Sequence, residues 1–429
     1  MADRRDPEGG LRIAHFSDTF LPRRDGVITS IRTLAAALAA RGHESVLFTP
    51  MARPIDVGFP LVGLASLPCG VADLRLAAWP RSRHVALVAA LDADVVHVHT
   101  PGPAGLLGVL AAQRLGLPLV QTYHTDLHAY LEAYRIPTTA LRIGLAAYRA
   151  RLGAQAPPRR IALRPVRDAW RAERRSATRS DLLDAANAAF FGGTDLIVVP
   201  TGAVLRRAML PVEPDRVVTV PTGVAPRAVA ADAGLAFRRR HGIAADAPLV
   251  LFVGRVNREK NVADLLAATA VIARTLPSVR VALVGAVYER RWLARLLRTH
   301  GVADRVVTTG QLPAASVAEA YAAADVFAFP SLTDTQGLVL QEAALAGVPV
   351  VMADPTLYAH GPLTGGAVCA PGEGFASGIV ALLTDPVLAA KTVAAGRLAA
   401  LRHTPEAYGA GIEAVYRRVL GAPALRVSA

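Results

Sequence analysis

Short apolar runs alternate with segments whose apolar residues recur at helical spacing. The clearest example is the stretch 325–351, where Val326–Phe329 is a continuous apolar run and Leu338–Ala346 has helical spacing. Gly347 ends the predicted helix, and a second apolar run, Val348–Met352, follows. This order predicts a strand, a loop, a helix and a strand, which is one βαβ unit of a parallel sheet.

The same pattern extends over both halves of the chain. In the first half it predicts a helix at 27–40 and strands at 11–17, 45–49, 94–100, 119–125, 196–199 and 217–220. In the second half it predicts further strands at 249–254, 279–285, 305–310 and 368–371, and helices from 262 and at 374–383, 386–400 and 405–420. A Gly/Pro loop is expected at 101–105. Strands that alternate with helices in this way predict an α/β fold, and 429 residues suit two such domains.

Composition narrows the class of protein. Hydrophobic residues make up 52% of the chain and aromatic residues 5%, but no run of about 20 apolar residues lacks charges, so we expect no transmembrane helix. The N-terminus lacks the long apolar region of a signal peptide. Cys69 and Cys369 are the only cysteines and are far apart, which indicates buried thiols in a reducing cytoplasm, without a disulfide framework or a zinc site.

The formal net charge is +13, and lysine is scarce beside arginine, as a GC-rich bacterial genome would give. A positive field suits nucleotide diphosphates, anionic lipids or nucleic acid, but the chain has no nucleic-acid-binding signature. The segment Arg149–Arg179 contains ten arginines interrupted by prolines. It is either a solvated insertion or a loop that binds the acceptor or an anionic membrane surface.

Candidate chemistry lies at predicted strand ends. Asp334 follows a strand and Glu342 lies inside the next helix, beside the crevice where open α/β sheets bind ligands. An ordinary loop with a surface acid is the alternative. His97 and His99 alternate along a strand, but nothing nearby completes a ligand set, so we expect no metal. His124, at a strand end, is either a site residue or a packed structural histidine.

Further motifs together indicate a family. The chain opens with S-D-T-F-L-P-R-R-D-G-V, continues with V-H-V-H-T-P and H-T-D, and later has F-V-G-R followed by E-K-N. The stretch F-P-S-L-T-D-T-Q-G-L-V then precedes an E-A pair and G-V-P-V-V. With these motifs the chain resembles the retaining glycosyltransferases of glycosyltransferase family 4, over nearly all of its length except Arg149–Arg179. The first strand–helix unit lacks G-x-G-x-x-G, the dinucleotide fingerprint.

The resemblance implies a GT-B fold, with two facing Rossmann-like domains, an interdomain cleft and a C-terminal helix that crosses back. The domains would span 1–224 on the acceptor side and 225–404 on the nucleotide-sugar side, with the crossing helix at 405–429. It also implies a metal-independent reaction with no cofactor, in which a nucleotide-diphosphate sugar of the UDP or GDP type is the donor.

Roles carry over by position in the motifs. Arg255 and Lys260 match the basic pair that holds the donor diphosphate, and His124 matches the histidine near the transferred sugar. Glu342 matches the acid that binds the ribose, and Asp334 takes the place of an acid, usually Glu, near the sugar. Other donor-binding positions are implied at Gly26, Gly254, Gln311, Leu312, Thr335, Gln336, Gly337 and Leu338.

The acceptor is not identified by the sequence. Because Asp334 is shorter than the family's Glu and the basic segment does not form an amphipathic face, we expect a small-molecule acceptor, as in specialised-metabolite biosynthesis. Three alternatives remain open: a lipid glycosyltransferase at the inner membrane face, a pseudo-glycosyltransferase that couples a cyclitol, and a non-enzymatic nucleotide-sugar binder. We expect no nucleic-acid partner.

Overall fold

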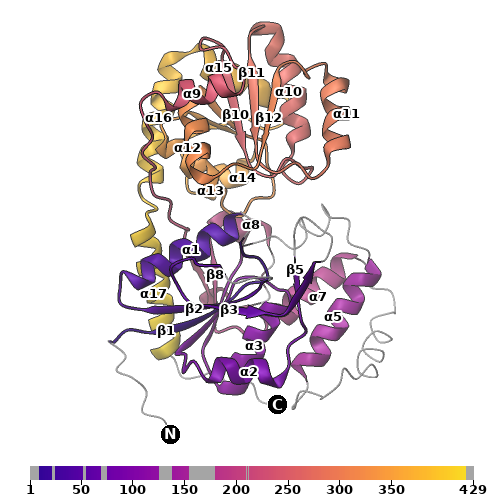
Figure 1. Ribbon diagram of the computed structural model, residues 1–429, viewed down its shortest axis with the longest axis vertical. Coiled ribbons are helices and arrows are strands. Elements are labelled where there is room, and N and C mark those ends of the chain that lie inside the picture. Colours follow the sequence, from indigo (N-terminus) through magenta and orange to yellow (C-terminus); the bar gives the residue numbers. More distant parts are fainter. Residues whose placement is uncertain are drawn as a thin grey trace. The chain divides into compact units, whose positions relative to one another are not determined.

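The computed structural model describes residues 9–21, 25–51, 55–68, 75–124, 138–153, 179–208, 210 and 212–421. The chain divides into two compact units (Figure 1). Unit 1 comprises Met1–Pro200, Arg207–Pro221 and Pro405–Ala429, and unit 2 comprises Thr201–Arg206 and Thr222–Thr404. Unit 1 gives way to unit 2 after Pro221, three residues before the expected boundary at 224, and the short segment Thr201–Arg206 also groups with unit 2. Cys69 and residues 154–178 of the arginine-rich segment lie outside the described residues.

Unit 1 contains a seven-stranded parallel sheet in the order β3-β2-β1-β6-β7-β8-β9. Its strands are β1 (Arg12–Phe16), β2 (Glu44–Pro50), β3 (Leu61–Leu64), β6 (Val95–Val98), β7 (Leu119–Thr122), β8 (Leu196–Val199) and β9 (Val217–Thr219). A separate antiparallel pair, β4 (Ser66–Pro68) and β5 (Arg75–Ala77), was not predicted. Because β8 is buried along its whole length, its apolar run is continuous instead of alternating.

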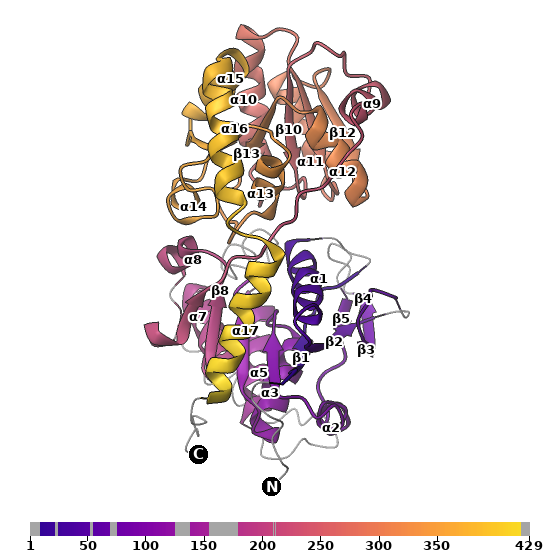
Figure 2. The same cartoon turned by 90° about the vertical axis from the view of Figure 1, so that its left-hand side faces the viewer.

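Helices complete unit 1: α1 (Gly26–Ala39), α2 (Ser82–Ala89), α3 (Pro103–Leu115), α5 (Thr138–Leu152), α7 (Arg179–Phe191) and α17 (Pro405–Gly421). The last helix, α17, packs beside α1 (Figure 2), and the hydroxyls of Ser30 and Tyr408 lie 2.8 Å apart. Tyr408 and Tyr416 of α17 are fully buried with Leu34 and Leu38 of α1 in one cluster. The C-terminal helix is therefore part of the core of unit 1.

Unit 2 contains a six-stranded parallel sheet in the order β12-β11-β10-β13-β14-β15. Its strands are β10 (Leu249–Val253), β11 (Arg280–Val284), β12 (Val306–Gly310), β13 (Val326–Phe329), β14 (Val350–Met352) and β15 (Val368–Cys369). Its helices are α9 (Ala233–Arg240), α10 (Val262–Thr275), α11 (Arg290–His300), α12 (Ala314–Ala323), α13 (Leu338–Leu345), α14 (Pro355–His360), α15 (Gly374–Thr384) and α16 (Pro386–Ala400). Helix α8 (Gly202–Arg207) ends where the chain returns from unit 2 to unit 1, and the 3-10 turn Pro214–Arg216 lies within unit 1.

Both faces of the sheet in unit 2 are buried. Val250 and Val326 belong to a cluster that includes α10 and α15, whereas Leu251 and Phe327 belong to one that includes α9, α12 and α13. This is the doubly wound arrangement, in which the loops at the carboxyl ends of adjacent strands lie together. Because β10 pairs directly with β13, the loops before α10 and α13 meet at one edge.

Two predicted elements differ from the structure for identifiable reasons. The loop expected at 101–105 ends at Gly102, because Asp18 accepts hydrogen bonds from the N–H groups of Ala104 and Gly105 and so caps α3. The strand expected from Val348 begins at Val350, because the Val348 N–H bonds to the Ala343 carbonyl and closes α13. Among the described helices, none alone is long and apolar enough to cross a bilayer, although the bent pair Gly374–Thr384 and Pro386–Gly421 satisfies length and composition together.

Candidate active site

The loop after β10 carries two cations on a tight backbone. Gly254 has a φ of 151°, a conformation that favours glycine. Asn261, at φ 53°, precedes α10, and its side chain donates to the Pro330 carbonyl (3.2 Å). Between them, Arg255 Nη2 donates to Glu259 Oε1 over 2.8 Å. These contacts anchor the β10–α10 loop to the neighbouring β13–α13 loop.

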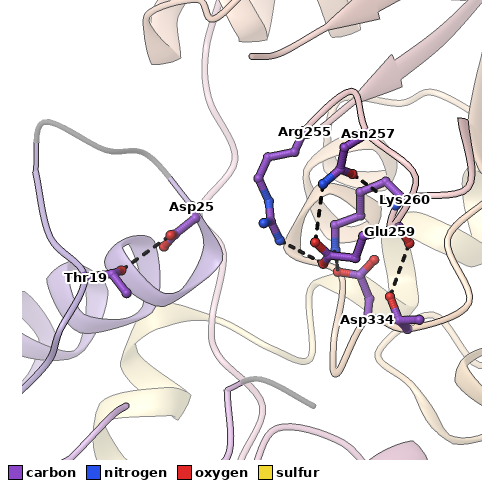
Figure 3. Close-up of polar contacts among 8 residues, drawn as sticks. Thr19, Asp25, Arg255, Asn257, Glu259, Lys260 and Asp334 are labelled. Carbon is purple, nitrogen blue, oxygen red and sulfur yellow. Dashed lines mark hydrogen bonds and ion pairs between the residues drawn. The ribbon is translucent and has the colours of Figure 1, made fainter. Parts of the chain in front are cut away.

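Asp334 lies in the β13–α13 loop and meets the first loop through Lys260 (Figure 3). Lys260 Nζ is 2.7 Å from Asp334 Oδ1 and 3.3 Å from Glu259 Oε1. The four side chains Arg255, Glu259, Lys260 and Asp334 therefore form one ion-pair network, with two positive and two negative groups. Their side chains are only 8–18% exposed, so water screens them weakly.

Burial and mutual attraction oppose each other in this network. Burial works against the charged ammonium of Lys260, but the carboxylates of Asp334 and Glu259 outweigh it and raise the pKa of Lys260. Burial would raise the pKa of Asp334, yet the attraction and hydrogen bond of Lys260 lower it. Both groups are therefore charged at neutral pH.

Helix α13 supplies the second acid. Glu342 lies in its second turn, and Glu342 Oε2 accepts a 3.0 Å hydrogen bond from the Tyr321 hydroxyl of α12. Burial raises the pKa of Glu342, against the opposing effects of the Tyr321 bond and the Arg227 charge. Gly337, at the N-terminus of α13, has a φ of 70°, and a Cβ there would lie 2.9 Å from Leu340. Glycine at 337 therefore lets α13 begin at Leu338 directly after the loop that holds Asp334.

Two other predicted donor residues make structural contacts. The Gln336 side chain is buried, accepts from the Thr222 N–H (3.0 Å), and donates to the Thr222 carbonyl (2.8 Å) and to Gln341 (2.6 Å). The Thr335 carbonyl accepts from the Thr201 hydroxyl (2.6 Å). The Gln336 side chain therefore anchors the loop, and its predicted role in donor binding stays a prediction.

The remaining predicted positions in unit 2 follow β12. Gln311 is exposed, and Leu312 is half-buried against the core cluster that includes α12 and α13. Both come directly after the carboxyl end of β12, on the same edge of the sheet as the other loops.

In unit 1, Gly26 is the exposed first residue of α1. Asp25 caps this helix, because Asp25 Oδ1 accepts from the Ile28 N–H (3.1 Å), and Asp25 Oδ2 accepts from Thr19 over 3.4 Å (Figure 3). His124 lies two residues beyond β7, and its Nε2 is 3.0 Å from His99 Nδ1. Gly26 therefore begins α1, and His124 lies just after β7 and not within it; their roles in binding stay predictions.

Sequence reasoning missed three residues that support these groups. Glu259 lies inside the quoted E-K-N motif, but the motif does not show that its side chain joins Arg255 to Lys260. Tyr321 lies 21 positions before Glu342, and no spacing rule links the two. His15, in the first strand, became visible only when the sheet order placed β1 beside β6.

Comparisons with known proteins identify the family of this chain. The family model "Glycosyltransferase Family 4" matches residues 24–227, and "Glycosyl transferases group 1" matches residues 247–385. A D-inositol 3-phosphate glycosyltransferase of Kineococcus radiotolerans is 30% identical over 442 residues, covering 92% of this chain and 91% of that protein. A GDP-mannose-dependent alpha-mannosyltransferase of Mycolicibacterium smegmatis is 28% identical, covering 97% of this chain and all of that protein.

Another relative is named as a glycolipid synthase. The alpha-monoglucosyldiacylglycerol synthase of Streptococcus pneumoniae is 26% identical over 344 residues, which cover 80% of this chain and 70% of that protein. Among solved structures, sucrose-phosphate synthase of Thermosynechococcus elongatus has a TM-score of 0.67 at 22% identity, covering 96% of this chain and all of that one. HepE of Anabaena, in complex with UDP-glucose, has a TM-score of 0.66 at 18% identity, covering 94% and 99%.

The structural likeness shows the GT-B fold, whose two parallel-sheet α/β domains correspond to units 1 and 2. The identity and coverage of the relatives show the family. This chain therefore belongs to glycosyltransferase family 4 and is a retaining glycosyltransferase.

Proposed function

We propose that the protein transfers a sugar, with retention, from a UDP or GDP sugar to a hydroxyl of a small-molecule acceptor. One observation carries this proposal: Arg255 and Lys260 are held together, nearly buried, where the loops of two adjacent parallel strands meet. Two fixed cations at this edge suit a leaving nucleoside diphosphate, whose negative charge grows in the transition state.

In the proposed reaction, the bond from the sugar anomeric carbon to the diphosphate oxygen breaks while a bond to the acceptor oxygen forms on the same face. The acceptor proton passes to a phosphate oxygen. The chain contributes charge stabilisation and orientation. The proposed reaction uses neither a metal ion nor a cofactor. The diphosphate competes with Glu259 for Arg255 and with Asp334 for Lys260, so donor binding exchanges internal ion pairs for ligand contacts.

Each acid has a proposed part of the donor. For Glu342, which Tyr321 holds inside α13, the proposed partners are the ribose hydroxyls. For Asp334, in the preceding loop, the proposed partners are hydroxyls of the transferred sugar, from which a carboxylate accepts strong hydrogen bonds. The relatives include a GDP-mannose-dependent enzyme, and a protein of the same fold was solved with UDP-glucose. Both bases are therefore candidates.

A membrane lipid is the second candidate acceptor, and the similarity to a glucosyldiacylglycerol synthase favours it. In that case the enzyme would work at the inner membrane face, and the basic segment Arg149–Arg179 would contact anionic lipid. Sedimentation with vesicles of phosphatidylglycerol distinguishes the two acceptors. Salt-sensitive binding to these vesicles, and not to phosphatidylcholine vesicles, supports the lipid enzyme.

The proposed donor is tested by a thermal-shift screen of UDP, GDP, ADP and dTDP sugars, because a donor that binds only the folded state raises the melting temperature. The donor that gives the largest shift is then incubated with acceptor mixtures, and the anomeric configuration of the product is determined by NMR. A UDP or GDP sugar should stabilise the wild type, and Lys260→Ala should lose most of that shift. Stabilisation by none of the sugars, or a product of inverted configuration, would refute the proposal.

A further inference from the structure

Four histidine side chains meet inside unit 1. His15 on β1 pairs in register with His97 on β6, and His99 follows two residues later on the same side. His124 extends the group from the end of β7, the next strand in the sheet. His15, His97 and His99 are each at most 2% exposed.

Three of the rings form a continuous chain of hydrogen bonds. His124 Nε2 is 3.0 Å from His99 Nδ1, and His99 Nε2 is 3.1 Å from His15 Nδ1. His15 Nε2 is in turn 3.2 Å from the Ser45 hydroxyl. The fourth ring, His97, is outside this chain, because its nitrogens bond to the hydroxyls of Tyr416 and Thr122, each at 2.7 Å.

A metal ion is a poor occupant for the cluster His15, His97 and His99, although their ring nitrogens lie within 4.8 Å of one another. All six of these nitrogens have hydrogen-bonding partners. Ligand nitrogens around a tetrahedral zinc ion, at about 2.1 Å from the metal, would lie roughly 3.4 Å apart. A bound metal would therefore break several short hydrogen bonds. Burial in addition lowers the pKa of His15 and of His124 to about 3, so neutral rings are stable where they are.

Counting protons shows that the three linked rings are coupled. A neutral imidazole has one N–H, and each ring-to-ring hydrogen bond needs one proton. If His124 has its proton on Nε2, it donates to His99 Nδ1, so His99 has its own proton on Nε2 and donates to His15. If His124 has its proton on Nδ1, both links reverse. The three rings must therefore all be the same tautomer.

We infer that His99 and His15 are positioning residues for His124, which fix its ring orientation and shift their own protons together with it. This inference rests on the proposed function, with His124 near the transferred sugar as the family resemblance implies. Ser45 at the far end accommodates either direction, since a hydroxyl donates or accepts. The His124 proton can thus lie on either ring nitrogen, and no charge is created in the buried cluster.

The test is NMR of the full chain with ¹⁵N-labelled histidine at pH 7, in which the ring nitrogens report the tautomer. Signals are assigned by single substitution of His15, His99 and His124. In the wild type, these three rings should be neutral and all of one tautomer. Different tautomers among them, or a charged ring, would overturn the inference. The deciding spectrum is that of the wild type, and the variants serve only to assign its signals.

Variants separate positioning from general damage. His99→Gln interrupts the chain, so His15 and His124 should no longer be coupled, and kcat should fall about tenfold or more, since misplaced groups cost this much. His97→Gln is the matched control, two residues away and equally buried. It should leave the tautomers of the other rings unchanged. Equal effects of both substitutions on His124 and on kcat would show a merely structural role.

The two proposals fail separately. If His124→Ala retains wild-type turnover, the role of His124 beside the sugar is wrong, whereas the tautomer coupling is still decided by the wild-type spectrum. If the tautomers differ while His124→Ala lowers turnover, the proposed function stands and the positioning role fails.

Discussion

Replacing Lys260 with methionine, which has a similar length and no charge, should destabilise unit 2 more than replacing Asp334 with asparagine. Lys260 is the group that both acids share, at 2.7 Å from Asp334 and 3.3 Å from Glu259. Without the ammonium, the buried Asp334 carboxylate loses this ion pair, whereas Glu259 retains Arg255. Without the Asp334 charge, Lys260 retains Glu259. We therefore expect the loss of the Lys260 charge to lower the free energy of unfolding more than the loss of the Asp334 charge.

The magnitude follows from the distance and the burial. Two unit charges 2.7 Å apart attract by about 6 kcal/mol at an effective dielectric of about 20. Desolvation offsets much of this, and breaking a buried pair from one side costs about 3–5 kcal/mol. We therefore expect about 3–5 kcal/mol for Lys260→Met and about 1–3 kcal/mol for Asp334→Asn, where hydrogen bonding capacity remains. The double variant should be more stable than the sum predicts, with a coupling energy of about 1–3 kcal/mol.

Urea unfolding at pH 7 measures these values without adding salt that would screen the charges. Of the three tryptophans, Trp292 is the one in unit 2, so a background with Trp79→Phe and Trp170→Phe makes fluorescence report that unit. Arg240→Gln, at the surface pair with Glu319, is the control and should cost less than about 1 kcal/mol. Equal losses for Lys260→Met and Asp334→Asn, with strictly additive effects, would refute the assignment of Lys260 as the shared partner.

Three further predictions concern Glu259, Glu342 and the buried histidines. Glu259→Gln removes the carboxylate that holds Arg255. Calorimetric titration should then show nucleoside diphosphate binding about fivefold tighter, which is about 1 kcal/mol. Unchanged or weaker binding would contradict this. Tyr321→Phe frees Glu342 from its 3.0 Å bond, and intact donor and nucleoside diphosphate should both bind about fivefold more weakly; a loss confined to the intact donor would place Glu342 on the sugar. The buried neutral histidines bind protons only when unfolded, so stability should fall as pH drops below about 6.5, by up to about 1.4 kcal/mol per pH unit for each ring. Acid titration of His97→Gln should show a slope shallower by one proton, and an unchanged slope would mean that this ring is not neutral when folded.

The strands around the candidate site could be predicted because their burial is nearly complete. Val326–Phe329 is buried throughout, and its apolar run therefore stood out from the polar loop that follows. The first and last residues of helices and strands were harder to predict, because they depend on single hydrogen bonds. The Val348 N–H closes α13 and delays β14, and the Asp18 carboxylate starts α3 within a loop rich in glycine and proline.

The hydrogen-bond partners of side chains were harder to predict than the helices and strands. The alternation of His97 and His99 placed them on one face, but His15 joins them through the order of strands in the sheet, which local sequence does not show. Gln336 lies in a motif associated with donor binding, yet its amide is satisfied by Thr222, more than a hundred residues earlier in the chain. Long-range contacts of this kind depend on the topology, whereas propensity and periodicity are local.

The two polar clusters share a physical property that bears on how the enzyme binds a charged donor. In unit 1, the linked imidazoles are neutral, so protons redistribute among them without a change of charge. In unit 2, two cations and two carboxylates balance, so neither sign is left buried and uncompensated. A donor diphosphate brings negative charge, and it gains attraction only where carboxylates give way. Glu259 and Asp334 contact the cations from different loops, so each can be displaced separately. If the diphosphate binds Arg255 and Lys260 as proposed, its affinity should depend on how tightly these two acids hold them.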